Sequence, residues 1–446
     1  MTAAPVGSPR VGSTIDYEKF LDCVHCGLCT AACPTYLETG DENNSPRGRI
    51  YLMRSLVDGR LGLTAKVEEH LDLCLDCRSC ETACPSGVQY GRLIEPFRAS
   101  QRMAEAAAGA AKNTDWFHRL ILYGLFPFPR RMRWALGPAR LMQRLGIDRL
   151  LEKSGLTGLL PRRLQRMQRF LPQLVPGGPP LPAILPAIGP KKARVALFTG
   201  CVADAVFRHT HWATARVLAQ NGCDVVVPRN QVCCGAIHYH SGADEPAMQL
   251  ARINASAFDA AGVDAVLVNV AGCGSMLKDY GHIARELEPQ NQDLHESLGR
   301  CAAKMKDVSE FLAELGIVPP AGEIRLRAVY QDACHLAHAQ NVREQPRELL
   351  AQIPGLQIVP IAEPEICCGA AGSYNLTEPE MSDRLAQRKL QNILAASPQA
   401  VITGNVGCSM QIQAALRAAR RDIWVAHPME LLDLSYRGLQ PPGALQ

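Results

Sequence analysis

CVHCGLCTAACP at residues 23–34 and CLDCRSCETACP at residues 74–85 repeat one cysteine spacing, C-x2-C-x2-C-x3-C-P. Two intervening residues let three thiolates converge on three irons of one cube, and the fourth cysteine reaches the neighbouring cube. The pattern therefore predicts a pair of [4Fe-4S] clusters. We expect the first cluster to be held by Cys23, Cys26, Cys29 and Cys84. We expect the second to be held by Cys74, Cys77, Cys80 and Cys33.

Zinc sites and disulfide frameworks also use closely spaced cysteines, but both fit this chain less well. A structural zinc ion takes four ligands, typically as two C-x2-C pairs, which leaves three cysteines at successive x2 spacings unexplained. Disulfide frameworks are typical of short secreted domains. This chain has 446 residues, and residues 1–20 lack the apolar core of a secretory signal. We therefore expect a reduced, cytoplasmic protein.

Composition narrows the class of protein further. The length suggests about three domains, and 47% hydrophobic residues suffice for large cores. No apolar run approaches the roughly 20 residues of a membrane-spanning helix. Aromatic residues make up only 5% of the chain and form no pattern with basic residues, so we expect no nucleic acid partner. The net charge of +4 excludes nothing by itself.

The insert between the two cubane motifs predicts a helical first domain. Ser45-Pro46 is a helix start, and Ile50, Met53 and Val57 recur at helical spacing behind it. We therefore assign residues 1–110 to an α-helical ferredoxin domain rather than to the small β-hairpin type. Arg47 and Arg49, at the start of this helix, either balance the negative charge of the clusters or form a solvated pair.

Residues 111–192 differ in character from the first domain and predict a linker. Between residues 116 and 175 only Asp148 and Glu152 oppose twelve cations, which alternate with large apolar side chains. The cations are Arg119, Arg130, Arg131, Arg133, Arg140, Arg144, Arg149, Lys153, Arg162, Arg163, Arg166 and Arg169. Such a stretch lies on an anionic membrane surface or a partner, or it packs on its own protein. The proline-rich residues 172–190 predict an extended spacer.

An internal repeat fills the rest of the chain. Its first copy holds Cys201, Cys233, Cys234 and Cys273. Its second copy holds Cys334, Cys367, Cys368 and Cys408. The gaps on either side of the Cys-Cys-Gly triplet are 32 and 39 residues in the first copy and 33 and 40 in the second. We call residues 193–322 module 1 and residues 323–446 module 2.

Strand and helix signals alternate within each module, which predicts a parallel sheet. The expected strands are 194–199, 224–227 and 265–270 in module 1 and 328–331, 356–361 and 400–403 in module 2. The expected helices include 205–220, 245–261 and 378–394. The fold class is thus α + α/β, an N-terminal α-helical ferredoxin domain followed by two Rossmann-like Cys-Cys-Gly modules. The cysteines follow strands, at the carboxyl ends where open α/β sheets bind ligands.

The role of the eight repeat cysteines stays open at this point. They either bind a cofactor, as further iron-sulfur clusters, or pack the core as structural thiols. Cys223 and Cys301 lie outside every pattern and are expected to be buried structural thiols. The histidines near these positions are metal ligands, proton carriers or hydrogen-bonding core residues, the last being our expectation. They are His238, His240, His335, His338 and His427.

No sequence signature indicates a group that takes two electrons from an organic substrate. The fingerprints G-x-G-x-x-G after a strand, the P-loop and H-E-x-x-H are absent. Iron-sulfur clusters move single electrons, so we expect a flavin or similar cofactor on another subunit. The chain itself carries no predicted catalytic residue.

The longer signatures resemble the iron-sulfur subunit of bacterial glycolate oxidase. They are CVHCGLCTAACPTY at 23–36, SPRGRIYL at 45–52, CLDCRSCETACPSGV at 74–88, CCGAIHYH at 233–240 and CCGAAGSYNLT at 367–377. The resemblance implies a complex with flavoprotein subunits that carry FAD and oxidise glycolate to glyoxylate. It also implies a quinone or similar membrane acceptor, and hence a peripheral location on the inner face of the cytoplasmic membrane.

Two other interpretations accompany this resemblance. The chain is similar, more broadly, to iron-sulfur subunits of glycerol-3-phosphate dehydrogenase, lactate-utilisation proteins and heterodisulfide reductase. In the reductase the last cysteine of each module is part of a Cys-x-x-Cys pair, whereas Met276 and Gln411 stand at those places here, so disulfide reduction is not expected. A non-enzymatic iron-sulfur redox sensor is the alternative from another class. Two fixed cubane motifs favour a path for electrons over a sensor.

Overall fold

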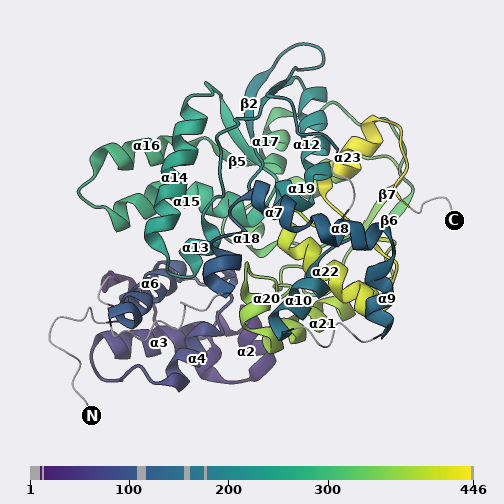
Figure 1. Ribbon diagram of the computed structural model, residues 1–446. Coiled ribbons are helices and arrows are strands. Elements are labelled where there is room, and N and C mark those ends of the chain that lie inside the picture. Colours follow the sequence, from purple (N-terminus) through teal and green to yellow (C-terminus); the bar gives the residue numbers. More distant parts are fainter. Residues whose placement is uncertain (1–10, 13–14, 108–116, 155–160, 175–177, 443–446) are drawn as a thin grey trace.

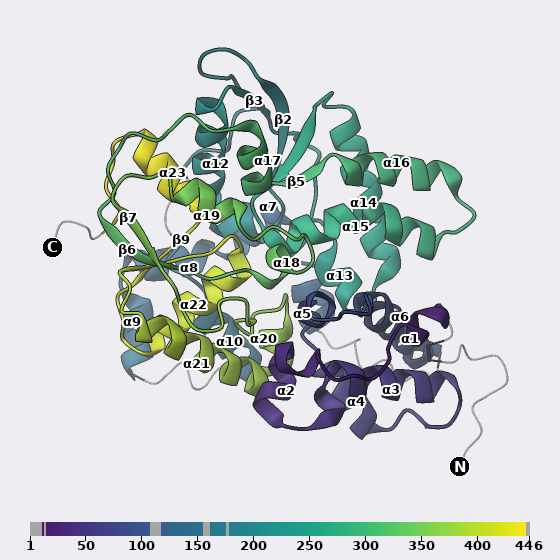
Figure 2. The same ribbon diagram turned by 180° about the vertical axis from the view of Figure 1, so that it is seen from behind.

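The computed structural model of the chain describes residues 11–12, 15–107, 117–154, 161–174 and 178–442. A group of short helices near the N-terminus lies beside two α/β modules, and the linker helices cover one side of both modules (Figure 1). Seen from behind, the N-terminal helices lie below module 1 and beside module 2 (Figure 2). The class is therefore mixed, helical at the start and α/β with parallel sheets beyond it.

The N-terminal helices are short and separated by the cysteine loops. They are α1 (Glu18–Leu21), α2 (Pro34–Thr39), α3 (Pro46–Val57), α4 (Ala65–Asp72), α5 (Ser79–Thr82) and α6 (Gly91–Ala107). The predicted start at Ser45-Pro46 is confirmed, because Ser45 Oγ accepts the Gly48 N–H at 3.0 Å as an N-cap. Ile50, Met53, Leu93 and Phe97 form a small apolar core between α3 and α6.

Module 1 contains a five-stranded sheet in the order β1-β3-β2-β4-β5. Its strands are β1 (Ile184–Leu185), β2 (Ala193–Phe198), β3 (Cys223–Val226), β4 (Ala265–Val268) and β5 (Met305–Asp307). Its helices are α11 (Val202–Val206), α12 (Arg208–Gln220), α13 (Ala236–His240), α14 (Asp244–Asp259), α15 (Ala271–Leu287), α16 (Gln292–Ala303) and α17 (Val308–Leu315). All pairs except β1 with β3 are parallel.

Module 2 repeats this topology in a parallel sheet with the order β7-β6-β8-β9. Its strands are β6 (Leu326–Tyr330), β7 (Leu356–Val359), β8 (Ala400–Ile402) and β9 (Trp424–Ala426). Its helices are α18 (Cys334–Ala337), α19 (Gln345–Leu350), α20 (Tyr374–Thr377), α21 (Pro379–Ala395), α22 (Val406–Ala418) and α23 (Pro428–Tyr436). The shared strand order of β2–β5 and β6–β9 confirms the repeat that the cysteine spacing predicted.

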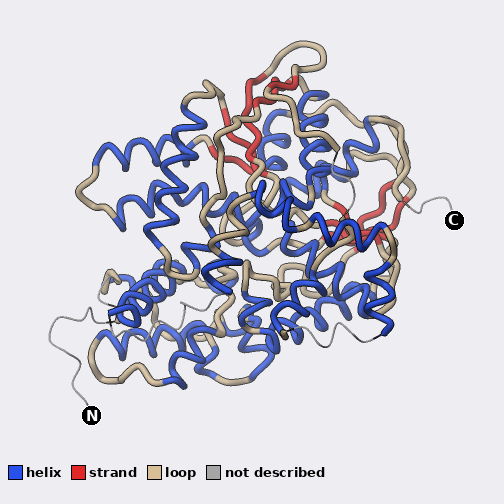
Figure 3. The backbone as a smooth tube through the Cα atoms, viewed as in Figure 1, coloured by secondary structure: helices blue, strands red, loops and turns tan. Residues whose placement is uncertain are grey.

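The two sheets are separate in space, but one of the hydrophobic clusters is shared between them, beside one cluster mainly within each module. The sheets form two groups of strands in Figure 3. Buried residues of both sheets, among them Leu197, Leu267, Ala328 and Ile402, belong to one continuous cluster. Helix α12 packs on α23 and α17 packs on α19, so each module covers part of the other. The modules therefore do not have independent cores.

The linker is helical and is packed against the modules. It contains a π-helical turn (Phe117–Leu122) and the helices α7 (Pro129–Ala135), α8 (Gly137–Arg144), α9 (Ile147–Ser154) and α10 (Arg162–Phe170). The prediction of an extended spacer at residues 172–190 is wrong in part. Ile184 pairs antiparallel with Val226, and Leu181 is buried. Prolines are tolerated there because β1 is an edge strand, where a missing N–H costs no ladder bond.

Two further expectations differ from the structure. The single helix expected at 205–220 is divided, because Phe207 leaves the helical conformation between α11 and α12. The short strands β1, β5 and β9 were not predicted, since two or three residues carry no readable period. No helix among the described residues is long and apolar enough to cross a membrane.

Candidate metal centres

The cysteines of the first predicted set line one pocket at the surface of the N-terminal helices. Cys23, Cys26, Cys29 and Cys84 border an open space of about 410 Å³. His25 and Gly27 have positive φ angles of 55° and 87°, which curls the loop around this space. A β-carbon at Gly27 would lie 2.4 Å from the Arg47 guanidinium, so a larger residue there would displace Arg47 from the cysteine loop. Cys26 is exposed, and the pocket therefore opens to solvent.

The second predicted set lines an adjoining, more enclosed pocket. Cys33, Cys74, Cys77 and Cys80 border a space of about 320 Å³. Asp76 and Arg78 have positive φ angles of 52° and 61°, at the same motif positions as His25 and Gly27. A left-handed residue other than glycine costs roughly 1–3 kcal/mol. Cys80 and Tyr90 line both pockets, so the two sites share a wall.

A buried cation shows that these thiols suit an iron-sulfur cluster. Arg49 is 1% exposed, and its hydrogen-bond partners are uncharged. They are His70 O at 2.7 Å, Thr35 Oγ1 at 3.0 Å and Cys33 Sγ at 3.9 Å. A buried charge requires an opposite charge nearby. Burial raises the pKa of the Cys77 thiol well above its usual range, so only metal-bound thiolates would supply negative charge here.

Arg47 behaves differently from Arg49. Its Nε lies 2.6 Å from Glu42 Oε1 in a partly exposed ion pair, and its Nη1 donates to His25 O at 3.1 Å. The two predicted roles, balancing the charge of a cluster and lying in solvent, therefore apply to different arginines. Arg49 faces the thiols, and Arg47 forms a surface pair that also supports the first cysteine loop.

In module 1 the four cysteines meet at the carboxyl ends of β2, β3 and β4. Cys201 Sγ lies 3.3 Å from Cys233 Sγ, and Cys234 forms hydrogen bonds with both Cys233 and Cys273. Hydrogen bonds from neighbouring thiols, together with burial, raise the pKa of Cys201 and Cys234 well above the usual range. A metal that binds here must therefore displace protons.

The four cysteines of module 2 repeat the arrangement. Cys367 forms hydrogen bonds with Cys334 and Cys368, and Cys368 forms one with Cys408. All four side chains are buried. Hydrogen bonding from a neighbouring thiol and burial raise the pKa of Cys367 and Cys408 well above the usual range. Each module thus collects four sulfur atoms, the number that one iron-sulfur cluster requires.

The glycine of each Cys-Cys-Gly turn is required by the backbone and by its neighbours. Gly235 and Gly369 both have φ of 86°. A β-carbon at Gly369 would lie 2.6 Å from Ser382 O in α21, and one at Gly235 would lie 3.3 Å from Ala247 O in α14. The turn therefore holds the two adjacent thiols against the following long helix in both modules.

The second cubane motif and two cysteines of module 2 are buried in the same cluster. Cys77 belongs to one buried cluster with Cys334 and Cys367, closed by Leu75, Tyr374, Met381 and Leu385. Tyr374 Oη donates to Leu73 O at 3.0 Å across the same junction. The thiols of module 1 lie instead in a cluster formed mainly by residues of that module. The two modules therefore meet the N-terminal helices unequally.

Asn405 connects the two sets of module cysteines. Its Nδ2 donates to Cys408 Sγ at 3.3 Å. Its Oδ1 accepts the N–H of Gly272, the residue before Cys273, at 3.4 Å. Ala271 N donates to Gly404 O at 3.1 Å beside this contact. The first turn of α15, which bears Cys273, thus lies directly on the loop that leads to Cys408.

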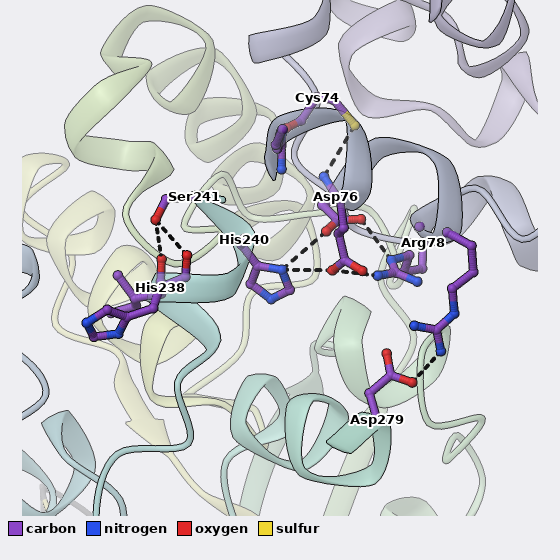
Figure 4. A network of polar contacts seen from close by, with 12 residues as sticks. Cys74, Asp76, Arg78, His238, His240, Ser241 and Asp279 are labelled. Atoms are coloured by element: carbon purple, nitrogen blue, oxygen red, sulfur yellow. Dashed lines mark hydrogen bonds and ion pairs between the residues drawn. The ribbon is translucent and has the colours of Figure 1, made fainter. Parts of the chain in front are cut away.

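A buried network of charges joins the second cubane loop to module 1 (Figure 4). Arg78 lies 2.8 Å from both Asp76 and Glu95. His240 Nδ1 lies 2.9 Å from Glu95 Oε1 and 3.4 Å from Asp76 Oδ2. Burial disfavours the imidazolium, but the hydrogen bonds to Asp76 and Glu95 outweigh burial and raise the pKa of His240 to about 9. The three acid and base groups are neutralised by one another and by Arg78.

Sequence reasoning missed several of these residues. Asp76 and Arg78 stand in the x2 gaps of the motif, where the backbone adopts positive φ. Residues other than glycine are uncommon in this conformation, and the presence of two charged ones could have indicated a buried ion pair. Glu95 and Asn405 carry no such signal, because their partners lie far away in the sequence. His240 was named from the sequence, but its acidic partners were not.

The remaining cysteines and histidines follow the structural expectation in most cases. Cys223 and Cys301 are buried in the module cores. His427 Nδ1 accepts the Met429 N–H and its Nε2 bonds Asn269 O. His338 Nδ1 bonds Thr82 Oγ1 at 3.0 Å. Two histidines differ from this expectation. His238 has a buried Nδ1 without a hydrogen-bond partner, and its ring stacks on Tyr123. His335 Nδ1 lies 3.5 Å from Cys334 Sγ.

The linker presents two different faces. On its inner face Arg133 pairs with Asp204, and Arg166 pairs with Asp383 at 3.0 Å. Leu122 and Phe170 are buried against α20 and α22. On its outer face Trp134 is 85% exposed, and Leu141, Leu145 and Leu150 are more than half exposed. Arg130, Arg131 and Arg144 are also exposed. Trp116 lies outside the described residues, and the side chains of Arg149 and Lys153 are not described.

Comparison with known families identifies each region. The family described as the linker region of the glycolate oxidase iron-sulfur subunit matches residues 113–171. The 4Fe-4S dicluster domain matches residues 19–88. The cysteine-rich domain matches residues 195–278 and 328–413. The matched domains show that this is an iron-sulfur protein.

Whole-chain comparisons agree with these matches. The chain is 38% identical to a probable glycolate oxidase iron-sulfur subunit of Bacillus subtilis, over 90% of this chain and 89% of the relative. It is 32% identical to the glycolate oxidase iron-sulfur subunit of Escherichia coli, over 90% and 92%. The crystal structure of a hypothetical protein from Helicobacter pylori shares the fold, with a TM-score of 0.50 and 8% identity over 94% of this chain and 74% of that one.

Proposed function

Because this chain belongs to the family of glycolate oxidase iron-sulfur subunits, we propose that it carries electrons within a flavin-dependent glycolate dehydrogenase complex. Glycolate is oxidised to glyoxylate on a flavoprotein subunit that holds FAD. The electrons pass through this chain to a quinone or similar membrane acceptor. The chain itself contributes no residue to the oxidation of glycolate.

The proposed ligands follow the four groups of thiols. Cys23, Cys26, Cys29 and Cys84 hold one cubane, and Cys74, Cys77, Cys80 and Cys33 hold the other. The four cysteines of each module hold a further iron-sulfur cluster. Bound clusters supply one-electron transfer, which divides the two electrons of a flavin into single steps. The protein supplies the spacing, the burial and the compensating charges.

The burial of Cys77 in one cluster with Cys334 and Cys367 carries this proposal. The exposed Cys26 lies at one end of a row of thiol sites. Cys80 lines both cubane pockets, and Cys77 is buried together with cysteines of module 2. Asn405 bonds both Cys408 of module 2 and Gly272, the residue before Cys273 of module 1. A row of adjoining sites from the surface to the interior suits electron transfer. A sensor needs only one exposed site.

The exposed end of this row is the proposed docking site for the flavoprotein. Val24 is 68% exposed, Leu28 is 60% exposed and Tyr51 is 54% exposed beside the Cys26 loop. Apolar and tyrosine side chains of this kind form the centres of protein interfaces. We therefore expect Val24→Glu with Leu28→Glu to weaken assembly with the flavoprotein. Ile253→Glu, on α14 of module 1 and 44% exposed, is the matched control.

The outer face of the linker is the proposed membrane contact. Exposed Trp134, Leu141 and Leu145 stand among exposed arginines, a composition typical of helices that lie in the interface of an anionic membrane. The chain is then peripheral on the inner face of the cytoplasmic membrane, where a quinone is within reach.

The test separates the roles of the subunits. The isolated chain should show no flavin absorbance and no oxidation of glycolate with an artificial dye, whereas the assembled complex should show both. In a complex that carries Cys77→Ser, glycolate should still reduce the flavin, but electrons should not reach a quinone analogue. Flavin bound tightly to this chain alone would contradict the assignment. Lactate in place of glycolate tests the choice of donor in the same assay.

A further inference from the structure

Module 2 contains a buried cation that no hydrogen bond neutralises. Lys389 lies on α21 and is 1% exposed. Its Nζ donates to Glu363 O at 2.7 Å and to Pro364 O at 3.1 Å. These carbonyls satisfy the donors but carry no net charge. A buried charge without an opposite charge is strongly destabilising, and burial lowers the pKa of Lys389. Its ammonium form is therefore stable only if a group nearby carries a negative charge.

The groups that face Lys389 are the thiols of module 2 and two carboxylates. Lys389 and Cys368 line the same narrow, closely packed gap between α21 and α22, and Cys368, Cys367 and Cys408 all favour the charged form of Lys389. Asp332 lies within electrostatic range, but both of its oxygens are bound by Arg347 at 2.7–2.8 Å.

Glu363 is engaged in the same way. Its carboxylate pairs with Arg388 and accepts a hydrogen bond from Asn392 at 2.9 Å. Both carboxylates near Lys389 are therefore already paired with guanidinium groups. The cysteines that line the site are left as the groups that can supply negative charge, and they can do so as metal-bound thiolates.

Module 1 has a neutral residue at the matching place. The turn glycine packs on Ala247 in module 1 and on Ser382 in module 2. Seven residues further along the two helices stand Asn254 and Lys389, respectively. Asn254 Oδ1 accepts the Val232 N–H at 2.9 Å, and its Nδ2 donates to Cys233 O at 3.0 Å. Both side chains tie the long helix to the cysteine segment, but only Lys389 adds a positive charge.

We propose that Lys389 is a charge-compensating residue that stabilises the four thiolates of module 2 and makes iron held there easier to reduce than iron held by module 1. The inference rests on the proposed function, since it requires iron-sulfur clusters in both modules. Asn254 gives the thiolates of module 1 no comparable support. Cys77 of the second cubane motif shares a buried cluster with cysteines of module 2. The module nearer to that motif is then also the one whose iron is easier to reduce.

The test uses the full chain after anaerobic reconstitution of its clusters. Signals of the two modules are assigned by Cys367→Ser and Cys233→Ser, and midpoint potentials are measured by redox titration with electron paramagnetic resonance. Lys389→Met keeps the length of the side chain and removes the charge. We expect it to shift the module 2 potential to more negative values, or to remove the module 2 iron, without a change at module 1. Lys389→Arg should restore the wild-type behaviour.

Arg384→Met is the matched control, because Arg384 is an exposed cation on the same helix. It should leave both potentials unchanged. A Lys389→Met chain that keeps its iron and its module 2 potential would overturn the inference. Equal iron loss in Lys389→Met and Lys389→Arg would overturn it too, because shape rather than charge would then decide. Wild-type iron that stays at about eight per chain would refute clusters in the modules and this inference, but not the role of the N-terminal clusters.

Discussion

His240 Nδ1 lies 2.9 Å from Glu95 Oε1, so the helix that follows the Cys-Cys-Gly turn of module 1 is bonded to the last N-terminal helix. The second cubane loop takes part through Asp76, which lies 3.4 Å from the same nitrogen. The relative placement of the cubane sites and module 1 therefore depends on a charged histidine.

This histidine makes stability depend on pH. The pKa of His240 is about 9 in the folded protein and about 6.5 in an unfolded chain. The contribution of His240 to the free energy of unfolding is fully present below pH 6.5 and is lost as the pH rises to 9. We expect the loss to be on the order of 1–2 kcal/mol, because the side chain is partly exposed.

The measurement compares thermal unfolding of the wild type and His240→Gln between pH 6 and about 9.5. Glutamine forms hydrogen bonds but does not titrate. The difference in midpoint between the two proteins should shrink as the pH rises. A difference that is constant with pH would show that His240 is neutral in the fold.

The turn glycine of module 2 should not tolerate a side chain. Gly369→Ala places a β-carbon 2.6 Å from Ser382 O at a φ of 86°, so we expect a loss of about 2–4 kcal/mol in stability. Gly372→Ala is the control. Gly372 also has positive φ, 66°, but open space around its β-carbon, so its cost should be only about 1 kcal/mol. Similar denaturation midpoints for the two variants would argue against close packing at the turn.

Metal content should depend on the cysteine groups. Cys77→Ser should lose one cubane, about four irons per chain, and should leave the first cubane in place because its four ligands lie in another pocket. Cys223→Ser changes a buried thiol outside the four groups and should keep all the iron. Iron analysis and spectra of the reduced, anaerobic protein measure the cluster content of the two variants. Stoichiometric zinc without iron after reconstitution would contradict the cluster assignment.

Membrane attachment should depend on the outer linker face alone. Exposed basic residues contribute about 1 kcal/mol each near an anionic surface, screened by salt. Charge reversal of Arg130, Arg131 and Arg144 should therefore weaken pelleting with anionic vesicles at low salt, with iron content unchanged.

The inner face of the linker provides the contrast. Arg133 pairs with Asp204 and Arg166 pairs with Asp383. Because glutamate at either position would repel its acidic partner, Arg133→Glu and Arg166→Glu should lower the melting temperature instead. If pelleting changes neither with salt nor with substitution of the outer arginines, the outer face does not bind the membrane and is instead a surface for a protein partner.

The parts of the fold that the sequence predicted are those with local causes. The Ser45 cap, the strands of four or more residues and the repeat were all readable, because a cap, a period and a spacing each lie within a short window. Fixed spacing also predicted which thiols would line each pocket. Ile184 pairs with Val226 only because module 1 offers an open edge, and the local proline content hid that strand.

The charged residues around the sites were harder to predict, because burial decides their meaning. Arg47 and Arg49 are two positions apart, yet one is a surface ion pair and the other is 1% exposed. Lys389 reads in the sequence as an ordinary helical lysine. Its significance comes from the carbonyls of Glu363 and Pro364 and from the thiols of the same module, which the helix period alone does not reveal.

The shared burial of Cys77 and Cys367 also constrains how the protein is made. Residues of the last quarter of the chain, among them Cys367 and Tyr374, bury Cys77 in one cluster, and the two modules share a further cluster. A ribosome that has released only the N-terminal helices therefore presents Cys74, Cys77 and Cys80 without their final cover. The complete burial of Cys77 is therefore a late event in the synthesis of the chain, because it waits for residues of module 2.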